Sequence, residues 1–179
     1  MSNGSPSIHA SAVLCGATGI LIRGPSGSGK SQLAFDLILA GRAGQIPPTR
    51  LVGDDRVHLV RDDARLIVRP SDALRGLIEI RGLGIRQIDF APEADVRLVV
   101  DLSAPDGERL PPSASLSIDL EGVTLPRQPV GAEYRPLPIV LATLITRAVS
   151  DGIAATDQPL SDDRQQGFGN HIRPMIATK

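Results

Sequence analysis

The chain has 179 residues, with 19 basic and 20 acidic side chains and a formal net charge of −1. This length suits one domain with a sizeable core, and the balanced charge argues against nucleic acid or an anionic membrane surface as a partner. Near Met1 there is no basic segment followed by an apolar stretch, and no apolar run is long enough to span a bilayer. We therefore expect a cytoplasmic protein. Cys15 is the only cysteine, which excludes an internal disulfide and a cysteine-based zinc cluster.

In chain order, the first clear element is a buried strand over Thr18–Arg23, and a helix follows from Ser31 to Ala40, where Gly41 should end it. The segment between them fits the phosphate-loop pattern G-x-x-x-x-G-K-S, with the residues Gly24, Pro25, Ser26, Gly27, Ser28, Gly29, Lys30 and Ser31. In such a loop backbone N–H groups converge on a polyphosphate, Lys30 adds positive charge, and the Ser31 hydroxyl can bind Mg²⁺. A strand, a glycine loop and a helix in this order predict a nucleoside triphosphate site in an α/β domain.

A second apolar run, Leu51–Gly53, ends in the paired acids Asp54 and Asp55. Phosphate-loop enzymes commonly place an acid at such a position, near Mg²⁺ or the attacking nucleophile. Because adjacent strand residues point to opposite faces, we expect one carboxylate to face the metal or its water shell and the other to face the acceptor. The alternative is a pair of solvated loop acids. For Asp62 and Asp63, at the tip of a predicted hairpin, we expect a structural role.

The stretch Leu77–Ile85 reads L-I-E-I-R-G-L-G-I and carries Glu79 and Arg81 from one face of an apolar strand into a double-glycine turn. Glu79 could be a second Mg²⁺ ligand beside Ser31, and Arg81 could steady phosphate oxygens or lock Glu79. The alternative is a structural Glu–Arg pair at a strand edge.

The later elements are a strand over Val96–Leu102, a loop over Ser103–Ser113, further strands over Leu116–Leu120 and Val123–Leu125, and a helix over Leu137–Val149. We place residues 1–150 in one domain. Residues 151–179 are polar and without periodicity, and we expect a flexible tail.

Four features in this order resemble the HPr kinase/phosphorylases, bacterial enzymes that phosphorylate a serine of the phosphocarrier protein HPr. They are His9 ahead of the first strand, the loop Gly24–Ser31, the run Leu51–Asp55, and the signature Leu77–Ile85. The phosphate loop is widespread among proteins, whereas paired Asp followed by E-I-R-G-L-G is narrow. The resemblance implies that residues 1–150 are the catalytic domain. It also implies a mixed β core with a few flanking helices, akin to the nucleotide-binding fold of phosphoenolpyruvate carboxykinase.

The resemblance also implies roles for single residues. Asp55 would accept the proton of the serine and return it in the reverse reaction. Ser31 and Glu79 would hold Mg²⁺, and His9 and Lys30 would be catalytic. Arg109, in the segment Asp106–Leu110, looks like a further catalytic arginine of the family. The remaining site positions are Asp54 and the signature residues Ile78, Ile80, Arg81, Gly82, Leu83 and Gly84.

The function implied is Mg-ATP-dependent phosphorylation of HPr, with phosphorolysis of phosphoseryl HPr as the reverse reaction, in regulation of the phosphotransferase system by a homo-oligomer, in the family a hexamer. The start so close to the kinase core resembles the short form of alphaproteobacteria, which lacks the N-terminal domain. Val130–Arg135 lies where the family has a glycine-arginine loop, but its pattern is degenerate, and the tail departs from the family's long C-terminal helix. The reverse reaction and the hexamer therefore stay open.

Two other functions stay open on the residues alone. One is a kinase of a small hydroxylated metabolite, which a concave pocket closed by a lid would favour. The other is a nucleotide-binding sensor without transfer chemistry, in which Asp55 only orders the loop.

Overall fold

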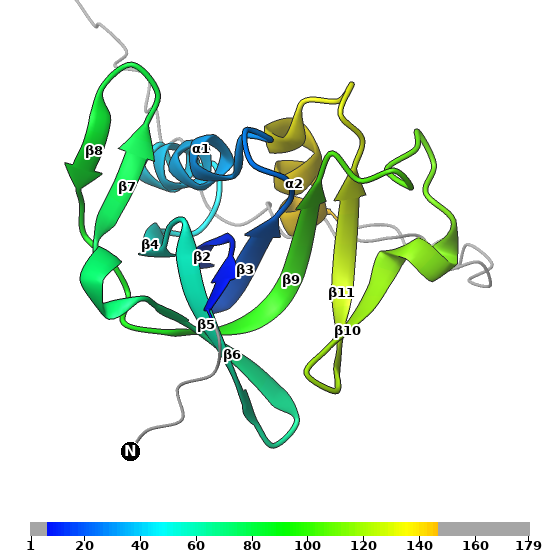
Figure 1. The fold of residues 1–179 in the computed structure, drawn as a ribbon. Helices are drawn as coiled ribbons and strands as arrows, with labels where there is room; N and C mark the ends of the chain where they lie inside the picture. Colours follow the sequence, from blue (N-terminus) through cyan, green and yellow to red (C-terminus); the bar gives the residue numbers. More distant parts are fainter. Residues whose placement is uncertain (1–6, 147–179) are drawn as a thin grey trace, which may run out of the picture. The chain divides into compact units, whose positions relative to one another are not determined.

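The computed structural model describes residues 7–146, and a mixed nine-stranded sheet forms its centre (Figure 1). The spatial order is β1-β5-β6-β9-β3-β2-β4, with β11 beside β9 and β10 beside β11. The strands are β1 (Ser7–His9), β2 (Ser11–Cys15), β3 (Thr18–Arg23), β4 (Thr49–Gly53), β5 (Arg56–Asp62), β6 (Arg65–Pro70), β9 (Ala94–Leu102), β10 (Ser117–Leu120) and β11 (Val123–Val130). The strand predicted over Thr18–Arg23 is β3, with the predicted bounds.

Strands β3, β9 and β11 run parallel to one another, and this arrangement positions the site. Their carboxyl ends meet at one edge of the sheet, where the phosphate loop, the segment 103–112 and the segment 131–135 begin. The central residues of β3, Ile20, Leu21 and Ile22, are apolar because the strand is covered on both faces. Ile20 and Ile22 pack into the core cluster that contains the helices, and Leu21 packs into the cluster on the opposite face.

Two helices, α1 (Lys30–Arg42) and α2 (Pro136–Ile145), pack against the first of these clusters through Leu33, Leu37 and Val140. The first helix was predicted to end at Ala40, which is two residues too early, since α1 continues through Gly41 to Arg42. Gly41 serves close packing instead, because a Cβ atom there would lie 2.7 Å from the backbone nitrogen of Thr49.

The second helix was predicted over Leu137–Val149, but α2 ends at Ile145. Thr146 is already extended, with φ −115° and ψ 168°. Residues 147–149 and the predicted tail 151–179 lie outside the described residues. Within residues 7–146, no helix is long and apolar enough to cross a membrane.

A separate hairpin of β7 (Leu77–Ile80) and β8 (Gly84–Gln87) stands beside α1 (Figure 1). Its first strand, β7, and the turn that follows are the predicted apolar strand and double-glycine turn. Short 3-10 helices cover Asp72–Leu74 and Ser113–Leu116. The hairpin predicted around Asp62 and Asp63 is formed by β5 and β6, and Asp63 occupies its turn with a φ of 53°.

Candidate active site

A pocket of about 670 Å³ lies between the phosphate loop and the β7–β8 hairpin. Its lining comes from segments far apart in the sequence. The lining residues are His9, Ser26, Gly27, Ser28, Gly29, Lys30, Ser31, Gln32, Asp54, Asp55, Leu74, Leu77, Ile78, Glu79, Ile80, Arg81, Gly82, Gly84 and Ile85. The fold thus brings most of the predicted site residues together around one cavity.

The phosphate loop connects β3 to α1, and its glycines take conformations that side chains disfavour. Gly27 and Gly29 have φ values of 78° and 94°, and Gly29 caps the start of α1. The Nζ atom of Lys30 donates hydrogen bonds to the carbonyl oxygens of Gly24 and Pro25, both at 3.0 Å. Burial lowers the pKa of Lys30, while the nearby charges of Asp54 and Asp55 act in the opposite direction. The amine therefore lies inside its own loop, within reach of any phosphate bound there.

Asp54 is buried, with 4% of its surface exposed, and its carboxylate accepts hydrogen bonds from three different elements. The hydroxyls of Ser11 and Ser31 donate to Oδ1 at 2.5 and 2.9 Å, and the backbone N–H of Glu79 donates to Oδ2 at 3.2 Å. Asp54 thus connects β2, the start of α1 and β7. Because Ser31 gives its proton to Asp54, the lone pairs of its oxygen stay available to a cation.

Asp55 is oriented differently from its neighbour. Its backbone is left-handed, with a φ of 63°, which Asp and Asn tolerate better than most residues. Its side chain is 64% exposed, and its Oδ1 lies 3.2 Å from Nε2 of His9. The two acids follow the strand rather than belong to it, since β4 ends at Gly53. One carboxylate is therefore held within the protein and the other lies at the open side of the pocket.

The oxygen donors in the pocket lining suit a magnesium ion. Ser31, Asp54 and Glu79 offer a hydroxyl and carboxylates, the hard donors that Mg²⁺ prefers. Within the described residues, no group of three or more His, Cys, Asp or Glu side chains could hold a metal ion. Mg²⁺ commonly takes one or two protein carboxylates together with substrate phosphates and water. The donor set therefore fits an ion that is bound together with a nucleotide.

Some predicted site residues lie apart from the pocket lining, namely Gly24, Pro25, Leu83 and Arg109. Gly24 and Pro25 contribute through their bonds to Lys30, whereas Leu83 is 58% exposed at the hairpin tip and Arg109 is exposed in the segment after β9. Arg81 lines the pocket, and among residues 7–146 no ion pair joins it to Glu79. The structural Glu–Arg pair is therefore not formed.

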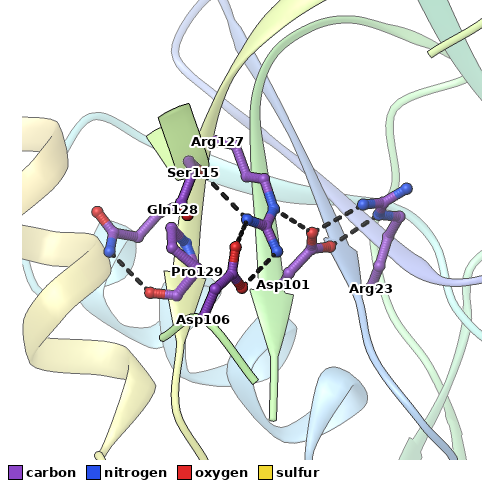
Figure 2. A network of polar contacts seen from close by, with 7 residues as sticks. All are labelled: Arg23, Asp101, Asp106, Ser115, Arg127, Gln128 and Pro129. Atoms are coloured by element: carbon purple, nitrogen blue, oxygen red, sulfur yellow. Dashed lines mark hydrogen bonds and ion pairs between the residues drawn. The ribbon is translucent and has the colours of Figure 1, made fainter. Parts of the chain in front are cut away.

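A network of ion pairs beside the phosphate loop was missed at the level of sequence (Figure 2). Asp101 accepts hydrogen bonds from Nε and Nη2 of Arg23, at 2.8 and 2.7 Å, and from Nε of Arg127 at 2.6 Å. Burial alone would raise the pKa of Asp101, but the bonds to both guanidinium groups outweigh it and the pKa is lowered. Asp101 is therefore engaged and is not a free metal ligand. The sequence signal that could have revealed the network is the presence of charged residues in strands that are otherwise mostly apolar.

The site is that of a phosphate-loop nucleotide-binding protein, because a glycine loop connects β3 to α1 and a buried carboxylate is bonded to Ser31. Comparison with known proteins identifies the family within this class. Residues 3–109 match the family model of the HPr serine kinase C-terminal domain, and the chain belongs to this family.

Two curated relatives named HPr kinase/phosphorylase illustrate the similarity. That of Mycoplasma mycoides is 39% identical over 101 residues, which are 52% of this chain and 30% of the relative. That of Limosilactobacillus reuteri is 32% identical over 166 residues, which are 84% of this chain and 49% of the relative. The chain thus spans about half or less of the length of these relatives.

Among solved structures, that of the Hpr(Ser) kinase/phosphatase from Coxiella burnetii matches with a TM-score of 0.63 and 26% sequence identity. The match covers 79% of this chain and 94% of that chain. The predicted family and the predicted α/β fold with a mixed β core are both confirmed.

Proposed function

We propose that this chain is an ATP-dependent serine kinase that acts on an HPr-type phosphocarrier protein, with Mg²⁺ bound beside the nucleotide. The observation that carries the proposal is that two adjacent acids have different environments. Asp54 is buried against Ser31 of the phosphate loop, while Asp55 faces the open side of the same pocket next to His9. The names of the curated relatives support the choice of acceptor.

Phosphoryl transfer needs positioned groups and stabilised charge more than covalent help from the protein. On nucleotide binding, Lys30 exchanges its bonds to the carbonyls of Gly24 and Pro25 for phosphate oxygens. Ser31 and Glu79 would hold Mg²⁺, which when bound neutralises part of the phosphate charge. The backbone N–H groups of the glycine loop complete the phosphate site.

Asp55 acts as the base toward the acceptor. It takes the proton of the serine hydroxyl as that oxygen bonds to the γ-phosphorus and the bond to the ADP oxygen breaks. His9 contacts Oδ1 of Asp55, which leaves Oδ2 for the serine. In phosphorolysis, an oxygen of inorganic phosphate bonds to the phosphorus of phosphoserine as the bond to the serine oxygen breaks. Asp55 gives its proton to that serine oxygen, and the pyrophosphate formed is released.

The openness of this base favours a protein acceptor over a small metabolite. The side chains of His9 and Asp55 are 44% and 64% exposed, so a serine on the surface of another protein can reach them. Kinases of small molecules more often enclose the acceptor to exclude water.

We also propose that the protein is a cytoplasmic homo-oligomer. Sedimentation velocity of the full chain tests the oligomeric state.

The deciding experiment incubates the chain with Mg²⁺, γ-labelled ATP and an HPr-type carrier, and then maps the modified residue. We expect label on a single serine, and none on a carrier in which that serine is Ala. Label on small molecules would favour a metabolite kinase, and ATP binding without transfer would favour a sensor.

Asp55→Asn tests the proposed base in the same assay. We expect nearly native Mg-ATP affinity with transfer reduced by about 10²- to 10⁴-fold, the usual worth of a general base. Asp63→Asn is the matched control, because Asp63 is also an Asp at positive φ, 53°, but lies in the β5–β6 turn and outside the pocket lining. Native transfer by Asp55→Asn would remove this residue from catalysis.

A further inference from the structure

Arg127, in β11, lies at the centre of the ion-pair network shown in Figure 2. Its side chain is 13% exposed. Nε donates to Asp101 at 2.6 Å, and Nη1 and Nη2 donate to the two carboxylate oxygens of Asp106 at 2.6 and 3.1 Å. Nη1 also donates to the carbonyl oxygen of Ser115 at 3.0 Å. One guanidinium group thus contacts β9 and both sides of the segment that follows it.

These contacts enclose the segment 103–112, which carries Arg109. Asp106 lies in its first half, and Ser115 lies in the 3-10 helix that follows its end. Both are held by the same side chain, so the loop between them is fixed at each side. The bonds to Asp106 are bidentate, a geometry that a guanidinium can make and an ammonium cannot.

The other end of the network lies at the start of the phosphate loop. Asp101 also binds Arg23, the last residue of β3, which directly precedes Gly24. Gly24 itself approaches β9 closely, because a Cβ atom there would lie 2.8 Å from the carbonyl oxygen of Leu102. The ion pairs therefore run from Asp106 to Arg23, the residue before the phosphate loop, and the loop packs against Leu102, the residue before the segment 103–112.

Close packing also limits how the segment can move while the network is intact. A Cβ atom at Gly107 would lie 2.2 Å from the backbone nitrogen of Gly131. The N–H of Ala104 donates to the carbonyl oxygen of Val130 at 3.0 Å. The two arginines and two aspartates cancel in charge, and partly buried ion pairs of this kind often add little stability compared with apolar side chains. The directional hydrogen bonds of these pairs instead fix the position of the segment 103–112.

We propose that Arg127 is a positioning residue for phosphoryl transfer, which holds the segment 103–112, and with it Arg109, in a fixed place relative to the phosphate loop. The inference rests on the proposed kinase function. Arg127 touches neither pocket nor substrate and acts through Asp101 and Asp106. A displacement of about 1 Å at a reacting group can cost about 100-fold in rate, so loosening this segment should reduce turnover.

The test compares Arg127→Lys with wild type, using the full chain, Mg-ATP and the HPr-type carrier. We expect kcat to fall by about tenfold or more while the Kd for Mg-ATP stays native, because the phosphate loop keeps its bonds to Lys30 and Asp54. Backbone amides of 103–112 should exchange hydrogen faster than in wild type. The matched control is Arg97→Lys, since Arg97 also pairs with an Asp on β9, Asp95, but near the other end of the strand. It should leave kcat and exchange unchanged.

Asp106→Asn serves as a second variant that leaves the bonds among Arg23, Asp101 and Arg127 in place. It should give the same two effects even if Arg127→Lys fails to fold. Coupling is then measured with Arg109→Ala. If Arg127 acts through Arg109, Asp106→Asn and Arg127→Lys cost no further rate in the Arg109→Ala background.

The outcomes separate the inference from the proposed function. A wild-type chain that transfers no phosphate to the carrier refutes the proposed function. With an active wild type, the inference alone is overturned by unchanged amide exchange in 103–112, by native kcat in Asp106→Asn, or by an equal loss of rate with and without Arg109.

Discussion

Asp54→Asn and Asp55→Asn change adjacent carboxylates to amides, and the structure predicts that the two changes affect different properties of the protein. Asp54 is buried and accepts three hydrogen bonds, while the side chain of Asp55 is 64% exposed and pairs with His9. We expect Asp54→Asn to lower stability and nucleotide affinity. Asp55→Asn should lower only the rate of transfer.

The magnitude for Asp54→Asn follows from its partners. An amide nitrogen in place of Oδ2 would face the N–H of Glu79, so that one partly buried donor loses its acceptor, at a cost of about 1–3 kcal/mol. The bonds from Ser11 and Ser31 lose their charge assistance, whereas the cost of burying a charge disappears. We expect a net loss of about 2 kcal/mol in the free energy of unfolding, or about 6 °C in Tm.

For Asp55→Asn the expected change in stability is within about 0.5 kcal/mol, because the side chain is exposed and Asn tolerates the left-handed backbone. Thermal unfolding followed by circular dichroism measures both variants. Calorimetric titration with Mg-ATP measures binding, where Asp54→Asn should lose about tenfold in affinity because the Ser31 hydroxyl is no longer held in place. Equal Tm values for the two variants, or native Mg-ATP affinity in Asp54→Asn, would refute the reasoning.

Three further predictions follow from other contacts. Lys30→Met should abolish Mg-ATP binding in calorimetry, because the positive charge on the phosphate site is lost. It should not lower Tm, because burial disfavours the charged form of Lys30 and lowers its pKa; a lower Tm would contradict this. The hydrogen bonds from Arg127 lower the pKa of Asp106 from 3.8 to about 2, so this carboxylate stabilises the fold fully above pH 3.8 and the contribution is lost as pH falls toward 2. Urea unfolding of Asp106→Asn should therefore show a weaker decline of stability in acid than wild type, and an unchanged decline would contradict the assignment. Gly107→Ala should lower the free energy of unfolding by about 1–3 kcal/mol, since its Cβ would meet the backbone of Gly131; native stability would show that the two segments can separate.

The sequence by itself determined the parts of the site that depend on short stretches of chain. The apolar run of β3, the spacing of glycines before Lys30 and the apolar periodicity of α1 are local patterns. They predicted the order of strand, glycine loop and helix that the structure shows. The acids after the second apolar run were also visible, as was the apolar strand that leads into the double-glycine turn. The last residue of the first helix was predicted wrongly, because Gly41 has the pattern of a stop signal although it lies within α1 and packs against Thr49.

Only the tertiary structure decided which of the two acids, Asp54 or Asp55, is buried and hydrogen-bonded and which is exposed to solvent. Ser11 and Asp54 are 43 residues apart, and they meet because the pairing of β2 with β4 places Ala12 opposite Gly53. The same holds for Arg23 and Asp101, 78 residues apart, which are partners in the pairing of β3 with β9. Such contacts depend on strand order and register, which are set by how all the apolar faces pack together. A local pattern can therefore name the residue types of this site, but it cannot say which side chains will hold one another.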